Sequence, residues 1–238
     1  MWAVLKKEIK SYFLSPIGYV FIGLFLAMCS LFFYLDVVNY GSLQFENMFY
    51  SGATILTFII PILTMRMFAE ERKVGTEQLL YTSPRSITGI VFGKFLAALF
   101  VVFITELCTL MYLAILFLFG TPHVQTALVT LLGFFLLSMA YVSFGMFASS
   151  ITENQIIAGV VTIGFFIITW FLPNFSTIFK PLSLVTMFDK FPLGLIALEE
   201  IISFVSFTIF FVLLTLILLQ RKKSVKFWCS SSQWKFRH

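Results

Sequence analysis

The sequence predicts an all-α polytopic membrane protein with six transmembrane helices. Of its 238 residues, 60% are hydrophobic and 11% are charged, whereas soluble domains contain about 25% charged residues. The apolar residues form six long runs separated by short polar stretches, and a helix of about 20 apolar residues crosses a bilayer. The polar stretches are too short for a separate soluble domain.

The six predicted spans follow the apolar runs. They cover residues 17–38, 52–68, 90–119, 125–148, 156–171 and 201–219. Pro16 opens the first run, and Pro61 lies inside the second, where a proline is expected to kink the helix. The third run is long for one crossing, so we expect it to tilt or to protrude into the cytosol. Gly89, Gly93 and Ala97 are spaced by four residues at its start, which favours close packing of another helix.

Residues 1–15 predict an amphipathic helix lying on the membrane surface. At 100° per residue the apolar positions share one face and the charged positions lie off it. The apolar positions are Trp2, Leu5, Ile9, Tyr12 and Phe13, and the charged ones are Lys7, Glu8 and Lys10. The alternative is a charged flank of the first span.

Residues 173–200 predict an outer re-entrant or interfacial pair of short helices between the fifth and sixth spans. The segment is half apolar, and no part of it reaches 18 apolar residues. Four residues interrupt it, namely Pro173, Pro181, Pro192 and Gly194. Non-helical backbone at membrane depth is tolerated where protein or water surrounds it.

The basic residues predict that both termini are cytosolic. With six crossings and the N-terminus inside, Lys180 and Lys190 are the only two of the 16 Lys and Arg residues that fall outside. Lys and Arg are enriched in cytosolic loops of membrane proteins. The net charge of +5 therefore reflects topology and contact with anionic lipid, and we expect no nucleic-acid partner.

The sequence shows no catalytic motif. Gly89–Phe95 resembles a nucleotide-binding loop but is one residue short between the glycines and has Phe95 where Ser or Thr binds the metal, so we interpret it as a packing segment. Cys29, Cys108 and Cys229 are scattered and lack the spacing of a metal site. We therefore expect no enzyme activity, cofactor or metal in this chain.

Glu106 is a carboxylate deep in an apolar run. An acid at the centre of a membrane helix costs about 2.5–3.5 kcal/mol on insertion scales, so it should face protein or water, or be protonated. It is either a polar point on a substrate path or a packing contact with Thr105, Thr109 or another helix.

The most highly charged part of the chain lies at 65–84, between the second and third spans. A helix is predicted for Met65–Lys73, in which Arg66 and Glu70 are spaced for an i,i+4 ion pair. Gly75 is expected to end this helix.

A second short helix is predicted after Gly75. Thr76 can cap it, with Glu77 in its first turn, and Ser83 before Pro84 ends it. The helix carries Leu79 and Leu80 in a polar setting. These leucines either bind a partner protein or dip into lipid.

These segments resemble the permease subunits of type-2 ABC transporters. The resemblance is carried by Thr64–Arg72, Gly75–Leu80, Thr82–Pro84 and Gly93-Lys94, and it covers residues 1 to about 222. The start, Lys7–Tyr19, is similar to the permeases of gliding motility and of nitrous-oxide-reductase maturation. Phe188–Phe191 and Gly194 also fit this branch.

The resemblance implies a six-helix permease in a prokaryotic cytoplasmic (inner) membrane, working as an exporter. A second copy or a paralogue would pair with it, and two separate ABC ATPase subunits would hold ATP and Mg²⁺. The residues implied in coupling to the ATPase are Glu70, Glu71, Arg72, Gly75, Thr76, Glu77, Leu79, Leu80, Thr82, Ser83 and Pro84.

Two further functions stay open from the residues alone, a secondary transporter or channel without an ATPase and a membrane anchor of a larger machine. Residues 223–238 extend beyond the usual end of such permeases as a basic, aromatic cytosolic tail. This composition suits either an anionic membrane surface or a disordered extension.

Overall fold

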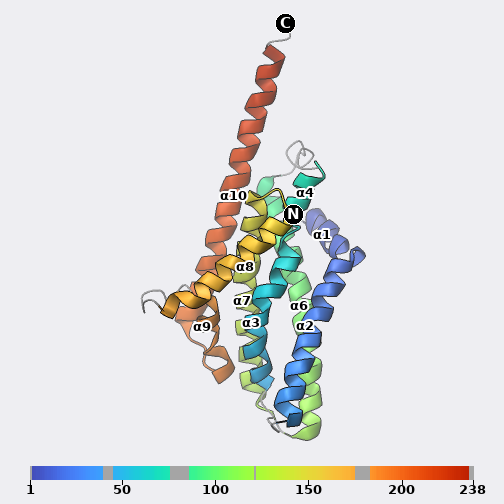
Figure 1. The fold of residues 1–238 in the computed structure, drawn as a ribbon, viewed down its shortest axis with the longest axis vertical. Coiled ribbons are helices and arrows are strands. Elements are labelled where there is room, and N and C mark those ends of the chain that lie inside the picture. The colour runs from blue at the N-terminus through green and yellow to red at the C-terminus, as the bar shows by residue number, and fades with distance from the viewer. Residues whose placement is uncertain (1, 40–44, 76–85, 121, 175–182, 236–238) are drawn as a thin grey trace.

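The computed structural model describes residues 2–39, 45–75, 86–120, 122–174 and 183–235. Across these residues all regular structure is helical and no strand occurs, as the sequence predicts. Figure 1 shows a bundle of long helices, with α1, α4 and the C-terminal part of α10 towards one end. We call this the α4 end and the opposite end, towards which α9 lies, the α9 end.

Six helices are long. They are α2 (Pro16–Phe33), α3 (Phe45–Thr64), α6 (Ile87–Phe119), α7 (Val124–Ile151), α8 (Gln155–Phe171) and α10 (Leu198–Lys235). The short elements are α1 (Trp2–Leu14), a π-helical turn η1 (Tyr34–Asn39), α4 (Ala69–Lys73), α9 (Leu184–Phe188) and two 3-10 turns, η2 (Leu172–Asn174) and η4 (Phe191–Leu193).

Five helical segments among the described residues are long and apolar enough to cross a membrane. They are Pro16–Asp36, Phe45–Lys73, Ile87–Phe119, Val124–Ile151 and Leu198–Lys223. Helix α8 is apolar but shorter, with 17 residues. Whether the chain crosses six times therefore depends on α8.

Several helices extend beyond the predicted runs. Helix α3 begins at Phe45 because Phe45, Met48 and Phe49 continue a buried i,i+3,i+4 stripe through a polar stretch. Helix α7 runs to Ile151. Helix α10 is continuous to Lys235, so the predicted tail boundary at residue 223 falls inside one helix that projects beyond the bundle (Figure 1).

Helix α7 is the central element, because it packs against α3, α6, α8, α9, η4 and α10. The Phe134 ring on α7 lies 5.5 Å from Phe25, 5.0 Å from Phe49 and 6.0 Å from Phe188 between ring centroids. Buried aromatic rings at these separations stabilise a core beyond the area they bury. Helices α2, α3 and α9 therefore share one aromatic core with α7.

Helix α1 meets α2 at a sharp elbow. Ser15 is extended and Pro16 is the first residue of α2, as the sequence predicts. At Gly18 an added Cβ would lie 2.6 Å from the Tyr12 carbonyl oxygen, so the close approach requires glycine. Glu8, which the sequence places off the apolar face of α1, is partly buried and accepts a hydrogen bond from Lys94 on α6.

Candidate functional site

The candidate site is the α4 end, where charged and polar side chains from five helices meet. A continuous helix was predicted over Met65–Lys73, and the structure corrects this: a turn at residues 65–68 separates α3 from α4. The cause is Ser149, whose Oγ accepts hydrogen bonds from the amides of Phe68 (3.0 Å) and Ala69 (3.1 Å). It also donates to the Met65 carbonyl (3.1 Å).

Ser149 therefore performs the role of an N-cap for α4 from another helix. The residue before α4, Phe68, offers no side-chain cap, and the first amides of a helix need acceptors from elsewhere. The sequence places Ser149 in a polar turn, but it is buried in the last turn of α7.

The C-terminus of α7 receives two cations. Arg72 donates to the carbonyl oxygens of Ser150 and Thr152, the latter at 3.1 Å. Lys222 on α10 donates to the same Ser150 carbonyl at 3.1 Å. The last carbonyls of a helix lack intrahelical partners and carry partial negative charge. Helices α4 and α10 are thus both tied to the end of α7.

A buried lysine joins α4 to α1 and α6. The Lys94 Nζ on α6 lies 2.9 Å from Glu71 Oε1 and 3.2 Å from Glu8 Oε1, and its side chain is 4% exposed. The Phe68 ring centroid lies 5.4 Å from the same nitrogen. A lysine in such a position is kept only where it is paired. We call Glu8, Glu71 and Lys94 the clamp.

Helix α1 lies close against α6 beside the clamp. A Cβ added at Gly93 would be 2.9 Å from Val4 Cγ1, so the predicted close approach occurs here, with α1 as the neighbour. The Tyr12 hydroxyl donates to the Leu63 carbonyl at 3.5 Å. Burial, and then the charges of Glu8 and Glu70, raise the pKa of Tyr12.

The predicted coupling residues have different surroundings. Glu70 lies 3.9 Å from Arg66, which confirms that i,i+4 pair, while Glu71 and Arg72 contact the rest of the protein. Gly75 ends the helix with φ +77°, a left-handed conformation that favours glycine. The remaining residues, Thr76, Glu77, Leu79, Leu80, Thr82, Ser83 and Pro84, lie outside the described part of the chain.

Sequence reasoning missed Glu8, Lys94, Ser149 and Lys222. Lys94 gave a usable signal, since a lysine in an apolar helix needs an anionic partner. Its partners come from two segments far away in sequence, so their identity could not be read locally.

Glu106 is buried in α6, with 7% exposure. The Thr105 and Thr109 hydroxyls donate to the backbone carbonyls of Val101 and Glu106 and not to its carboxyl group. The Oε1 atom is buried and has no hydrogen-bond partner among the described residues.

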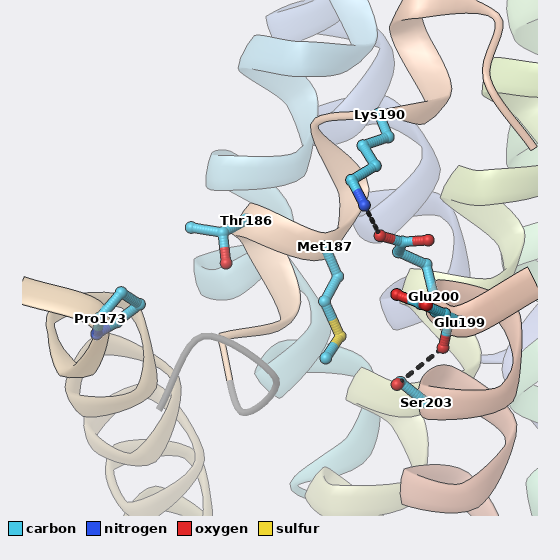
Figure 2. Close-up of a pocket in the computed structure, with 7 residues that line it drawn as sticks. All are labelled: Pro173, Thr186, Met187, Lys190, Glu199, Glu200 and Ser203. Carbon is cyan, nitrogen blue, oxygen red and sulfur yellow. Dashed lines mark hydrogen bonds and ion pairs between the residues drawn. The ribbon is translucent and has the colours of Figure 1, made fainter. Parts of the chain in front are cut away.

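At the α9 end, the short elements α9 and η4 pack into the bundle. Phe188 and Phe191 are fully buried, and a Cβ on Gly133 of α7 would lie 2.3 Å from Phe191 Cγ. Lys190 binds Glu200 at the start of α10, beside a cavity of about 390 Å³ (Figure 2). The hydrogen bond to Glu200 raises the pKa of Lys190. The described part of the predicted re-entrant segment is thus held by buried aromatic rings and one ion pair.

Comparison with known proteins identifies a family for nearly the whole chain. The family model described as ABC-2 family transporter protein matches residues 2–228. No curated protein matches the sequence.

Proposed function

The chain belongs to the ABC-2 family of transporter proteins, and we propose that it is the permease subunit of an ABC exporter. Members of this family are transmembrane components of ABC transporters and generally work with ABC ATPase partners. The chain itself is a membrane transport component and not the ATPase. We propose that ATP and Mg²⁺ are held by two separate ATPase subunits, and that a second permease copy or a paralogue completes the transporter.

The observation that carries this proposal is the way α4 is fixed at one end of the bundle. Ser149 bonds its first amides, Glu71 joins it to α6 and α1 through Lys94, and Arg72 joins it to the end of α7. A helix of five residues has little stability of its own. Its position is therefore set by these three contacts, and a force on α4 would act on all of them.

The proposed transporter places the α4 end in the cytosol of a prokaryotic cell, with both termini inside and α8 as the sixth crossing of the inner membrane. The ATPase would bind the segment that follows α4 in sequence, centred on Leu79 and Leu80. Closure of the ATPases on ATP would shift this segment and α4 together. Because nucleotide would bind the two transporter conformations with different affinity, it would bias the permease between them.

The first experiment is co-purification of the full chain with ATP-binding subunits from its native membrane, followed by ATPase measurement in lipid nanodiscs. We expect the double substitution Leu79→Asp and Leu80→Asp to abolish binding of the ATPase, because burying a carboxylate in an apolar contact is costly. The matched control is Leu195→Asp, an exposed leucine (56%) beyond η4 towards the α9 end, which should bind as the wild type does.

Two results would overturn the proposal. One is a chain that binds no ATP-binding subunit in the membrane. The other is full ATPase binding and stimulation by the Leu79 and Leu80 double variant, which would mean that this segment is not the docking surface.

A further inference from the structure

A second cavity, of about 410 Å³, opens at the α9 end, where three parts of the fold meet. Glu46, Asn47 and Tyr50 line it from the first turns of α3. His123 precedes α7, and Asp189 and Leu193 come from the segment around η4. No Lys or Arg is among the described residues that line it. We call it the acidic pocket.

Glu46 is buried in this pocket and is not paired with a Lys or Arg side chain of the described residues. It is 8% exposed, and its electrostatic partners are its own backbone amide and the His123 imidazole. No Lys or Arg forms an ion pair with it among the described residues. Carboxylates buried to this extent are usually paired or bound to a cation.

Asp189 is also not paired with the lysine that follows it in sequence, Lys190. Lys190 binds Glu200 on α10 instead, as Figure 2 shows. The Asp189 Oδ1 atom is buried and has no hydrogen-bond partner within the described part of the chain. Two carboxylates on different elements therefore face one cavity in which His123 is the one basic side chain among the described lining residues.

We propose that the acidic pocket binds a small organic cation that carries an ammonium group. An ammonium donates up to three hydrogen bonds, which suits Glu46, Asp189 and the Asn47 carbonyl, and Tyr50 offers an aromatic face for a cation. The volume is in the range of small-molecule pockets and far exceeds that of one metal ion. Among the described residues no three His, Cys, Asp or Glu side chains come together as metal ligands.

A bound cation would also connect two separate parts of the fold. Glu46 belongs to α3, whereas Asp189 belongs to the segment between α9 and η4. A ligand held by both carboxylates stabilises the arrangement in which this segment is packed in the bundle, because it binds that arrangement better than any other. Only the side of the membrane on which the ligand arrives rests on the proposed function.

The test measures binding of 1,4-diaminobutane to the full chain in lipid nanodiscs by isothermal titration calorimetry. The uncharged 1,4-butanediol and CaCl₂ serve as the comparison ligands. We expect the diamine to bind the wild type and the diol not to bind. Glu46→Gln and Asp189→Asn should each weaken diamine binding by about tenfold or more, since each removes a charge-assisted hydrogen bond to an ammonium group.

The matched control is Glu199→Gln, because Glu199 is an exposed acid at the same end that lines the other cavity. Its diamine affinity should equal that of the wild type. The proposal would be overturned if the diamine did not bind, or if both pocket variants bound it with the affinity of the wild type. Binding of Ca²⁺ that both variants abolish, without diamine binding, would show a metal site in its place. If Glu46→Gln fails to fold, Asp189→Asn decides the outcome, since Asp189 is only half-buried.

Discussion

Replacing Lys94 with methionine tests whether the clamp holds α1 and α4 to α6. Methionine keeps the length of the side chain but leaves Glu8 and Glu71, whose side chains are 14% and 19% exposed, without this cation. Removing one partner of a buried ion pair costs about 3–5 kcal/mol. Because both carboxylates retain some contact with water, we expect a loss near the lower limit, about 3 kcal/mol of unfolding free energy.

The assay is thermal unfolding of the chain in lipid nanodiscs, followed by tryptophan fluorescence, together with hydrogen exchange of α1. Lys94→Met should lower the midpoint and increase exchange in α1. The matched control is Lys7→Met, since the Lys7 side chain is 75% exposed and lies 3.9 Å from Glu8. Such surface pairs contribute about 0–1 kcal/mol, so this variant should behave as the wild type does.

A second variant separates loss of charge balance from loss of packing. In the triple variant Lys94→Met, Glu8→Gln and Glu71→Gln, the charges disappear together with the cation, so most of the lost stability should return. The reasoning fails if Lys94→Met unfolds at the temperature of Lys7→Met. It also fails if the triple variant is as unstable as the single one.

Three further predictions concern single side chains. Ser149→Ala should cost about 1–3 kcal/mol in chemical unfolding, because two amides lose their acceptor. Ser138→Ala is the control and should cost less, because its hydroxyl bonds only within its own helix; equal costs would contradict the capping role. Glu106→Met should stabilise the chain by about 1–3 kcal/mol, and a loss of transport despite higher stability would show that the acid serves function. Burial raises the pKa of Asp189, so its carboxyl binds a proton more tightly in the folded chain. The unfolding midpoint of the wild type minus that of Asp189→Asn should therefore fall as pH rises from about 3 to 6. A difference that does not change with pH would contradict this.

Features that depend on nearby residues could be predicted from the sequence. The apolar runs gave the long helices, Pro16 gave the start of α2, and Gly75 gave the end of α4. Each of these follows from the dihedral preference or the hydropathy of the residues concerned.

Features that depend on partners distant in sequence could not be predicted. The break after Thr64 arises because Ser149 competes for two amides that a continuous helix would have used. The clamp draws Glu8, Glu71 and Lys94 from three separate segments, and no local pattern connects them. The small-residue spacing around Gly93 predicted a close neighbour but could not say that this neighbour is α1.

Helix α7 connects the two ends of the bundle, and Gly133→Ala tests its contact at the α9 end. The added Cβ would lie 2.3 Å from Phe191 Cγ and 2.6 Å from Phe191 Cβ, so the ring and the turn around it must move. Overpacking of this kind costs about 1–3 kcal/mol. Because the buried Phe191 ring also packs against Phe188 and Phe204, with centroids 6.2 Å from each, we expect the segment around η4 to leave the bundle before α7 unfolds.

The measurement is labelling of a cysteine introduced at Met187, which is buried while the segment is packed, by a membrane-impermeant thiol reagent, with and without Gly133→Ala. Labelling should become faster in the glycine variant, because the segment spends more time away from α7. The control is Gly164→Ala on α8, where an added Cβ meets nothing within 4 Å, and here the rate should not change. Equal labelling rates in both backgrounds would show that the contact between Gly133 and Phe191 does not hold this segment, and α7 would then have no fixed connection to it.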